Sequence, residues 1–222
     1  DLSGDYGKII YFTPRIQGLQ LGASYLLEKA KLGTPVHVTT DFARGKSGAR
    51  KAAEAGVNYI GKIGGLSVGA AATFYSDVRP QLGQRDPSGL DLGLELALKG
   101  WTVGGNFLAG KNLSHAALYS NDTHTSVWSA GVTYGNGPWL LGGSFAQGTD
   151  DPIGVQNGVD YQSYILGVNY RLRPGVTLSL GWQHDKANPD SIGFVAPAGG
   201  AALPAGQSAA GDSVFVETGL KF

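Results

Sequence analysis

From Thr125 to Gln147 the chain reads T-S-V-W-S-A-G-V-T-Y-G-N-G-P-W-L-L-G-G-S-F-A-Q, and this stretch predicts a β-hairpin. Large apolar residues alternate with small or hydroxylic ones on both sides of the Asn136-Gly137 pair, which is a strong hairpin signal. One face of the hairpin carries Trp128, Ala130, Val132, Tyr134, Trp139, Leu141, Gly143 and Phe145. The opposite face consists mostly of Gly, Ser, Thr and Ala, so it cannot fill a hydrophobic core.

This division of faces indicates a membrane protein. A soluble β-sandwich buries one face of each strand and exposes a charged face to water. In a membrane barrel the apolar face contacts lipid, aromatic residues lie at both interfaces, and a small polar face lines a wet lumen. The hairpin has the second pattern, with aromatic residues beside its turn and again near its far end.

The same alternation recurs along the chain and predicts eleven strands of about seven to eleven residues. The expected strands are Lys8–Thr13, Leu19–Tyr25, Lys51–Ile60, Leu66–Ser76, Leu90–Leu98, Trp101–Phe107, Thr125–Tyr134, Trp139–Gln147, Ser163–Arg171, Val176–Gln183 and Ser213–Phe222. Tight turns (14–18, 61–65, 99–100, 135–137, 173–175) alternate with long loops (27–48, 77–88, 111–124, 148–159, 185–211). This asymmetry is typical of outer-membrane barrels, with the tight turns in the periplasm.

Aromatic residues on the apolar face are expected to form a girdle at the periplasmic interface, because they lie beside the tight turns. They are Tyr59, Trp101, Tyr134, Trp139 and Tyr170.

Composition supports a barrel and excludes several other classes. Only 15% of the 222 residues are charged, whereas about a quarter is usual in soluble domains. No run approaches the ~20 apolar residues of a membrane-spanning helix.

Lys and Arg together balance Asp and Glu at 17 each, so no net positive field attracts nucleic acid. The chain has no Cys for a disulfide or a thiolate. It also has neither Met nor a signal peptide, so we expect it to be processed or truncated.

The stretch Lys8–Tyr25, K-I-I-Y-F-T-P-R-I-Q-G-L-Q-L-G-A-S-Y, resembles the K-I-x-Y-x-T-P-x-x-x-G-x-x-x-G-x-S-Y hairpin of general bacterial outer-membrane porins. The resemblance implies an all-β fold, a transmembrane antiparallel barrel of sixteen strands, and assembly as a homotrimer. It also implies that Phe222 is a C-terminal assembly signal. In that family this hairpin follows the third external loop, which constricts the pore. We therefore expect residues 1–222 to be a single β-barrel domain that contains the C-terminal eleven strands of such a barrel. Five strands and most of the constriction loop are then expected upstream of Asp1. The alternative is a closed barrel of eleven strands.

The leading functional hypothesis is an outer-membrane pore for passive diffusion of small hydrophilic solutes and ions, in contact with the lipid bilayer and lipopolysaccharide. Inward-facing charges would set its ion preference, since they lie in the field of a water-filled lumen. The predicted pore-lining residues are Arg50, Glu54, Asp91, Glu95, Lys99, Arg171, Glu217 and Lys221. The alternatives are a substrate-selective porin and a structural or adhesive outer-membrane barrel with a plugged lumen. Solute preference, pore size and the constriction are not encoded in recognisable motifs.

Signals for chemistry are weak. Asp150, Asp151 and Asp160 fall in a predicted loop and could hold Ca²⁺, but their spacing is not that of an EF-hand, so a solvated acidic loop is favoured. His37, His115, His124 and His184 lack metal-ligand spacing and a neighbouring nucleophile. No G-x-S-x-G occurs and no Ser–His–Asp set is brought together by the pattern. We therefore expect neither enzymatic activity nor a cofactor.

Overall fold

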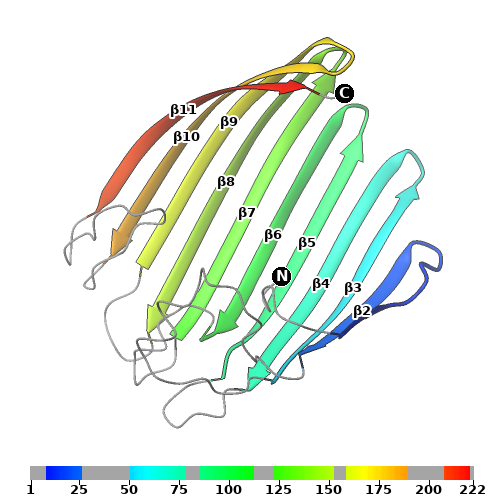
Figure 1. The fold of residues 1–222 in the computed structure, drawn as a ribbon, viewed down its shortest axis with the longest axis vertical. Helices are drawn as coiled ribbons and strands as arrows, with labels where there is room; N and C mark the ends of the chain where they lie inside the picture. Colours follow the sequence, from blue (N-terminus) through cyan, green and yellow to red (C-terminus); the bar gives the residue numbers. More distant parts are fainter. Residues whose placement is uncertain are drawn as a thin grey trace.

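The computed structural model describes residues 9–26, 51–78, 86–112, 123–152, 159–189 and 208–220, which form one antiparallel sheet. Its eleven strands pair in chain order, each with its neighbours (Figure 1). They are β1 (Ile9–Phe12), β2 (Leu19–Leu26), β3 (Lys51–Ile63), β4 (Leu66–Val78), β5 (Ser88–Leu98), β6 (Trp101–Lys111), β7 (Thr123–Asn136), β8 (Trp139–Pro152), β9 (Val159–Arg173), β10 (Val176–Pro189) and β11 (Ala209–Leu220). In the described part of the chain, no helix is long and apolar enough to cross a membrane.

The number and order of the predicted strands are confirmed, but most strands are longer than predicted. β7 to β10 each contain 14 or 15 residues. Residues 148–152 and 185–189, which were predicted to be loops, lie in β8 and β10. The apolar alternation ends there because the outward face becomes polar, while the backbone hydrogen bonds of the ladder continue. Sequence periodicity detects the apolar part of a strand and misses this polar extension.

Three of the tight turns are shorter than predicted, while the turn at residues 99–100 is as predicted. β3 continues to Ile63, which leaves Gly64 and Gly65 between β3 and β4. β7 continues to Asn136, so Gly137 and Pro138 connect it to β8. Gly64, Gly100, Gly137 and Gly175, one in each of the four two-residue turns, all have positive φ. These short turns lie at one end of the sheet (Figure 1).

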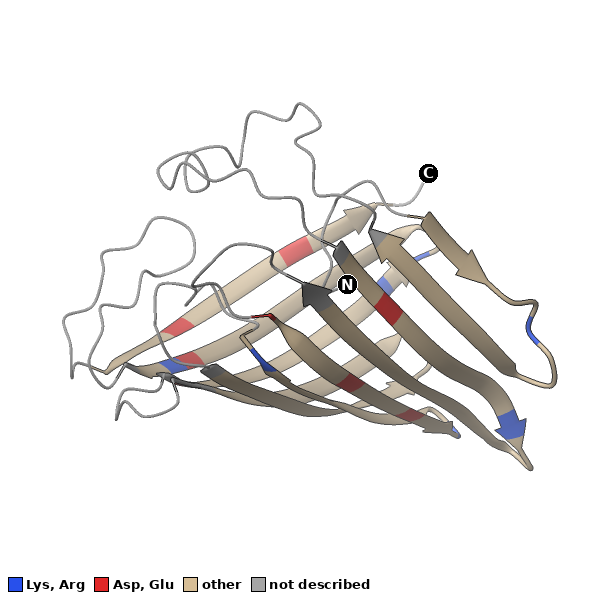
Figure 2. Ribbon diagram, turned by 90° about the horizontal axis from the view of Figure 1, so that it is seen from below, with Lys and Arg blue, Asp and Glu red and all other residues tan. Residues whose placement is uncertain are grey.

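The sheet curves into an open shell with a concave and a convex face (Figure 2). Its edge strands β1 and β11 do not pair with each other. Register assigns the residues of each strand to the two faces, because side chains alternate and directly paired residues share a face. Ile10 and Phe12, whose side chains the sequence could not assign to a face, lie opposite Ser24 and Gly22 on the concave face.

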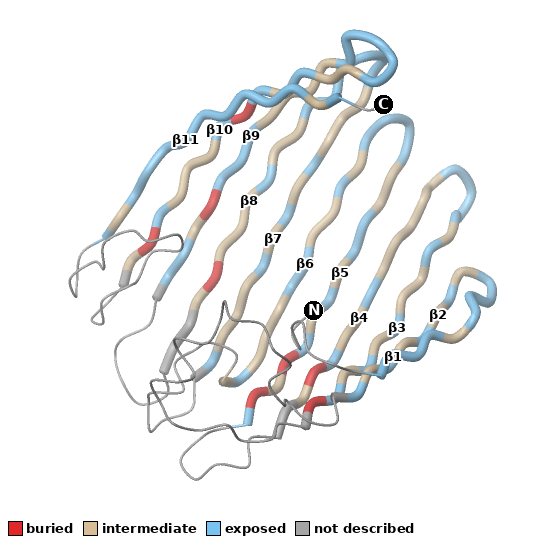
Figure 3. Tube along the Cα trace, viewed as in Figure 1, coloured by how far each residue is buried: buried red, intermediate tan, exposed pale blue. Residues whose placement is uncertain are grey.

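A single curved sheet leaves almost no hydrophobic core (Figure 3). Among the residues whose side chains are described, the buried apolar ones are Ala52, Tyr75 and Ala187. Large apolar side chains on the convex face stay exposed, for example Leu166 at 57% and Val216 at 75%. A free-standing sheet with this surface would aggregate in water, whereas lipid on the convex face removes the cost of exposing it.

Candidate functional site

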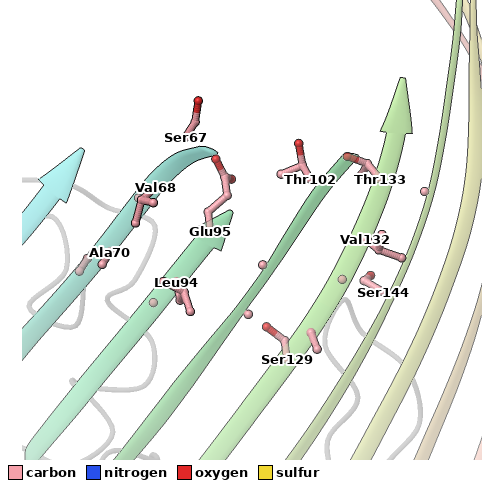
Figure 4. A pocket seen from close by; sticks show the side chains of 18 of the residues that line it. Ser67, Val68, Ala70, Leu94, Glu95, Thr102, Ser129, Val132, Thr133 and Ser144 are labelled. Carbon is pink, nitrogen blue, oxygen red and sulfur yellow. The ribbon is translucent and has the colours of Figure 1, made fainter. Parts of the chain in front are cut away.

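The concave face forms the candidate site, a recess of about 1270 Å³ that extends across the middle of the sheet. Its wall is smooth because the inward positions of β4 to β9 are mostly Gly, Ala, Ser and Thr. The hydroxyl groups of Ser67, Thr102 and Thr133 and the carboxylate of Glu95 are seen at close range in Figure 4. Small hydroxylic side chains leave room for water and present hydrogen-bonding groups to it, so this wall suits a hydrophilic passage.

Three of the predicted pore-lining carboxylates lie on this concave face in defined surroundings. Ser24 Oγ donates a hydrogen bond to Glu54 Oε2 at 2.9 Å. Asn106 Nδ2 donates to Asp91 Oδ1 at 2.6 Å. Glu95 is exposed in the recess between the glycines of the adjacent strands. The sheet therefore brings Asp91 and Glu95 onto one strand face and Glu54 onto the same wall two strands away.

The remaining predicted pore-lining residues lie near the tight turns or outside the described part of the chain. Arg171 and Glu217 are on the same concave face, where they pair with Thr177 and Ser179 and are exposed near the tight-turn end of β9 and β11. Lys99 is a turn residue with φ of 50° and not a member of the β5 wall, because β5 ends at Leu98. Arg50 and Lys221, as well as Phe222, lie outside the described residues.

A further inward carboxylate, Asp185, lies in β10, in a segment that the sequence predicts to be a loop. It follows Gln183 in the alternation of β10 and lies opposite Ser163. Tyr161 OH donates a hydrogen bond to Asp185 Oδ1 at 2.8 Å, and Gln183 Nε2 donates to Oδ2 at 2.8 Å. Continuing the period-two alternation beyond Gln183 would have identified this residue.

Four of the five aromatic residues predicted to form a girdle pack in pairs across neighbouring strands. Trp101 lies opposite Tyr134 with ring centroids 4.5 Å apart, and Trp139 lies opposite Tyr170 with centroids 4.4 Å apart. Tyr59 has no such pairing in register, and its ring covers Gly18 on the adjacent strand connection. Aromatic rings of this kind fit the boundary between lipid and water.

A second aromatic row lies farther from the tight turns on the convex face. Neighbouring rings in it have centroids 4.7 to 6.2 Å apart. Its members are Trp128, Phe145, Tyr164, Trp182 and His184. Asp212 of the edge strand β11 accepts hydrogen bonds from Trp182 Nε1 at 3.1 Å and, in the matching tautomer, from His184 Nδ1 at 3.0 Å. The sequence indicated only Trp128 and Phe145 at this level; aligning all strands on their turns would have added the others.

The convex face carries an uncharged band of membrane height. Among described side chains it has no Asp, Glu, Lys or Arg between the tight turns and the row formed by Lys111, Asp160, Lys186 and Asp212. On β7 the band runs from Tyr134 to His124, ten residues apart. At about 3.3 Å per residue and a strand tilt of about 40°, this distance corresponds to a height of about 25 Å, as in the apolar band of outer-membrane barrels.

The weak calcium candidate does not form a loop site. Asp150 and Asp151 belong to β8 and Asp160 to β9, where Asp160 pairs with Thr149. Within the described residues, no group of three or more His, Asp or Glu side chains could hold a metal ion. His37 and His115 lie outside those residues, and His124 and His184 lie on the convex face.

A protein-family model described as Gram-negative porin matches residues 1–190. No curated protein matches the chain in sequence.

Solved structures with the same fold include two outer-membrane proteins. Outer-membrane expressed OmpT of Vibrio cholerae aligns with a TM-score of 0.55 at 13% identity over 95% of this chain and 64% of OmpT. The anion-selective porin from Comamonas acidovorans aligns with a TM-score of 0.58 at 17% identity over 94% of this chain and 58% of that protein. This chain thus spans less than two thirds of either structure.

Proposed function

Because the chain belongs to the Gram-negative porin family, we propose that it forms part of the wall of a water-filled pore for passive diffusion of small hydrophilic solutes and ions. Its location is the bacterial outer membrane. The family and the fold point to a channel without enzymatic activity, so the proposed function requires no cofactor.

The observation that carries the proposal is the contrast between the two faces of one sheet. An uncharged convex band of about 25 Å fits the lipid layer, and a concave wall of small polar residues with several carboxylates fits a lumen that holds water. A plugged, purely structural barrel would be expected to fill its inward face with bulky or densely paired side chains. Across the recess the wall of β4 to β9 is mostly Gly, Ala, Ser and Thr, with Ile165 among the few bulky residues.

The complete pore is proposed to contain strands beyond these eleven and to assemble as a trimer. Barrel closure requires partners for the free edges of β1 and β11, since unpaired backbone groups are not tolerated in lipid. Five further strands would give the sixteen that the resemblance to general porins implies. Lipopolysaccharide and bilayer lipid are the proposed partners of the convex face, and Phe222 is the proposed assembly signal.

Conductance of the full-length protein in a planar bilayer tests the proposal. The expected result is large current steps that grow with bulk salt, and their partial block by added sugars would distinguish a substrate-selective pore from a general one. Absence of steps from protein shown to be folded and inserted would contradict the pore and favour a structural or adhesive barrel. Heat-dependent gel mobility provides the control for folding.

A further inference from the structure

Positive side chains of the concave wall gather at the tight-turn end. Arg15, in the connection between β1 and β2, donates hydrogen bonds to Gly18 O at 2.7 Å and to Gln20 Oε1 at 2.9 Å. Lys62 comes two residues before the Gly64-Gly65 turn and lines the recess with Arg15. Arg171 comes three residues before Pro174, on the face that Asn169 presents to the recess.

Carboxylates of the same wall extend farther toward the opposite end. Asp91 comes eight residues before the turn residue Lys99, and Asp185 follows Gly175 by ten residues. Asn106 donates a hydrogen bond to Asp91, Tyr161 and Gln183 donate to Asp185, and all three donors are neutral. A neutral donor orients a carboxylate without cancelling its charge. Figure 2 shows Asp and Glu along the strands and Lys and Arg both at the tight turns and at the loop end, where Lys111 and Lys186 belong to the convex face.

The remaining described carboxylates of the wall fit the same gradient. Glu54 lies ten residues before Gly64, level with Asp185. Glu95 lies four residues before Lys99, and Glu217 pairs with Ser179, four residues after Gly175. In the described wall, every carboxylate is therefore separated from the nearest tight turn by more residues than Lys62 and Arg171 are. Charges of the loop end such as Lys111, Asp160 and Lys186 are on the convex face.

Glu54, Asp91 and Asp185 form a carboxylate zone, and Arg15, Lys62 and Arg171 form a cationic zone, with Glu95 and Glu217 at levels between them. The two zones are far enough apart to act separately. From Lys62 to the level of Asp91 is six residues along the strands, or about 15 Å of height at about 3.3 Å per residue and a tilt of about 40°. The Debye length is about 10 Å in 0.1 M salt and about 3 Å in 1 M salt. Each zone therefore attracts its own counter-ions in dilute salt and is screened in concentrated salt.

We propose that this axial separation of charge makes the pore a rectifier, which passes more current when the loop side is positive than when it is negative. With the loop side positive, cations enter at the carboxylate zone and anions enter at the cationic zone, so both ions accumulate in the lumen. The opposite polarity draws each ion away from the zone that concentrates it, and the lumen is depleted. This inference rests on the proposed pore function and adds to it a preferred polarity of the current.

The test compares currents of the full-length protein at equal and opposite potentials, with orientation fixed by an Asn136→Cys variant. Asn136 is exposed beside a tight turn of a chain without Cys, so an impermeant thiol reagent identifies the side of the turns. The expected current ratio is about 1.5 to 2 in 0.1 M salt and about 1 in 1 M salt, because screening removes the asymmetry.

Two double variants locate the cause. Lys62→Gln with Arg171→Gln, and separately Asp91→Asn with Asp185→Asn, should each lower the ratio toward 1. The matched control, Lys111→Gln with Asp160→Asn, removes one charge of each sign from the convex face and should leave the ratio unchanged.

The outcomes separate this inference from the proposed function. Salt-dependent steps with equal currents at both polarities in dilute salt would overturn the rectifier and leave the pore intact. Rectification that survives both double variants would also overturn it, because the charge zones would not be its cause. Complete absence of current would contradict the pore itself. The size of the current ratio and its salt dependence can be measured on the wild-type protein, and only the polarity assignment uses Asn136→Cys, so a variant that fails to fold does not block the test.

Discussion

A single charged residue is expected to affect passing ions most where the surrounding wall carries only small side chains. Glu95 lies between Gly69 and Gly104 on the adjacent strands, and a Cβ atom at either glycine would be 3.8 Å from that of Glu95. The carboxylate therefore extends from a nearly flat surface into the recess. A charge in such a position acts on passing ions through water and not through packed neighbours.

Glu95→Lys is expected to shift ion selectivity toward anions, because it changes the wall by two charge units without altering a packed contact. The measurement is the reversal potential across a salt gradient, which should move by several millivolts toward the anion limit. Asp160→Lys makes the same change on the convex face and should leave the reversal potential unaltered. Equal shifts in the two variants would contradict a luminal role for Glu95.

Turn glycines offer a second residue-scale test. Gly64 and Gly100 both have positive φ, which costs an L-residue about 1 kcal/mol. A Cβ atom at Gly100 would also lie 2.5 Å from Gly135 O, whereas one at Gly64 would meet nothing within 4 Å. Gly100→Ala should therefore lower the free energy of unfolding more than Gly64→Ala does. Urea titration of the protein folded into vesicles measures both, and equal losses would show that the backbone contact relaxes.

Each strand presents one face to lipid and one to water, and its two faces should tolerate charge differently. Ala130 and Ser129 are consecutive residues near the middle of β7, opposite Phe145 and Ala146 respectively. By register, Ala130 belongs to the uncharged convex face with Gly105 and Phe145, while Ser129 belongs to the concave face with Asn106 and Ala146.

Ala130→Arg is expected to cost about 2–4 kcal/mol of folding free energy, as charged residues do at the bilayer midplane, while Ser129→Arg should cost little. The same urea titration in vesicles measures both changes. A reversed order of the two losses would mean that the convex face is not the lipid face.

For the whole molecule, the open edges of β1 and β11 and the covered fraction of the related structures favour a barrel with further strands, and the resemblance to general porins implies a trimer. The full-length protein is expected to migrate in unheated detergent gels as a trimer and to convert to monomers on heating. Chemical cross-linking at increasing detergent dilution provides the check. A single monomeric band under all conditions would contradict trimer formation while leaving the single-barrel pore possible.

Several features of the fold could be predicted from the sequence. Alternation between Trp128 and Tyr134 and between Trp139 and Phe145 defined which residues share a face, because side chains of a strand alternate strictly. The Gly-containing turns defined where neighbouring strands reverse, and together these signals predicted eleven antiparallel strands in chain order and the placement of Glu54, Asp91 and Glu95 on one wall.

Other features required the tertiary structure. Asp185 and the polar ends of β8 and β10 were not recognised as strand residues, because apolar alternation stops where the outward side chains leave the lipid while backbone pairing continues. Ile10 and Phe12 were assigned to a face only by their partners Ser24 and Gly22. The axial order of charges also depends on register, since it compares heights on strands far apart in the chain. Local sequence thus determined the two faces of each strand, and only the pairing of all strands decided what each face surrounds.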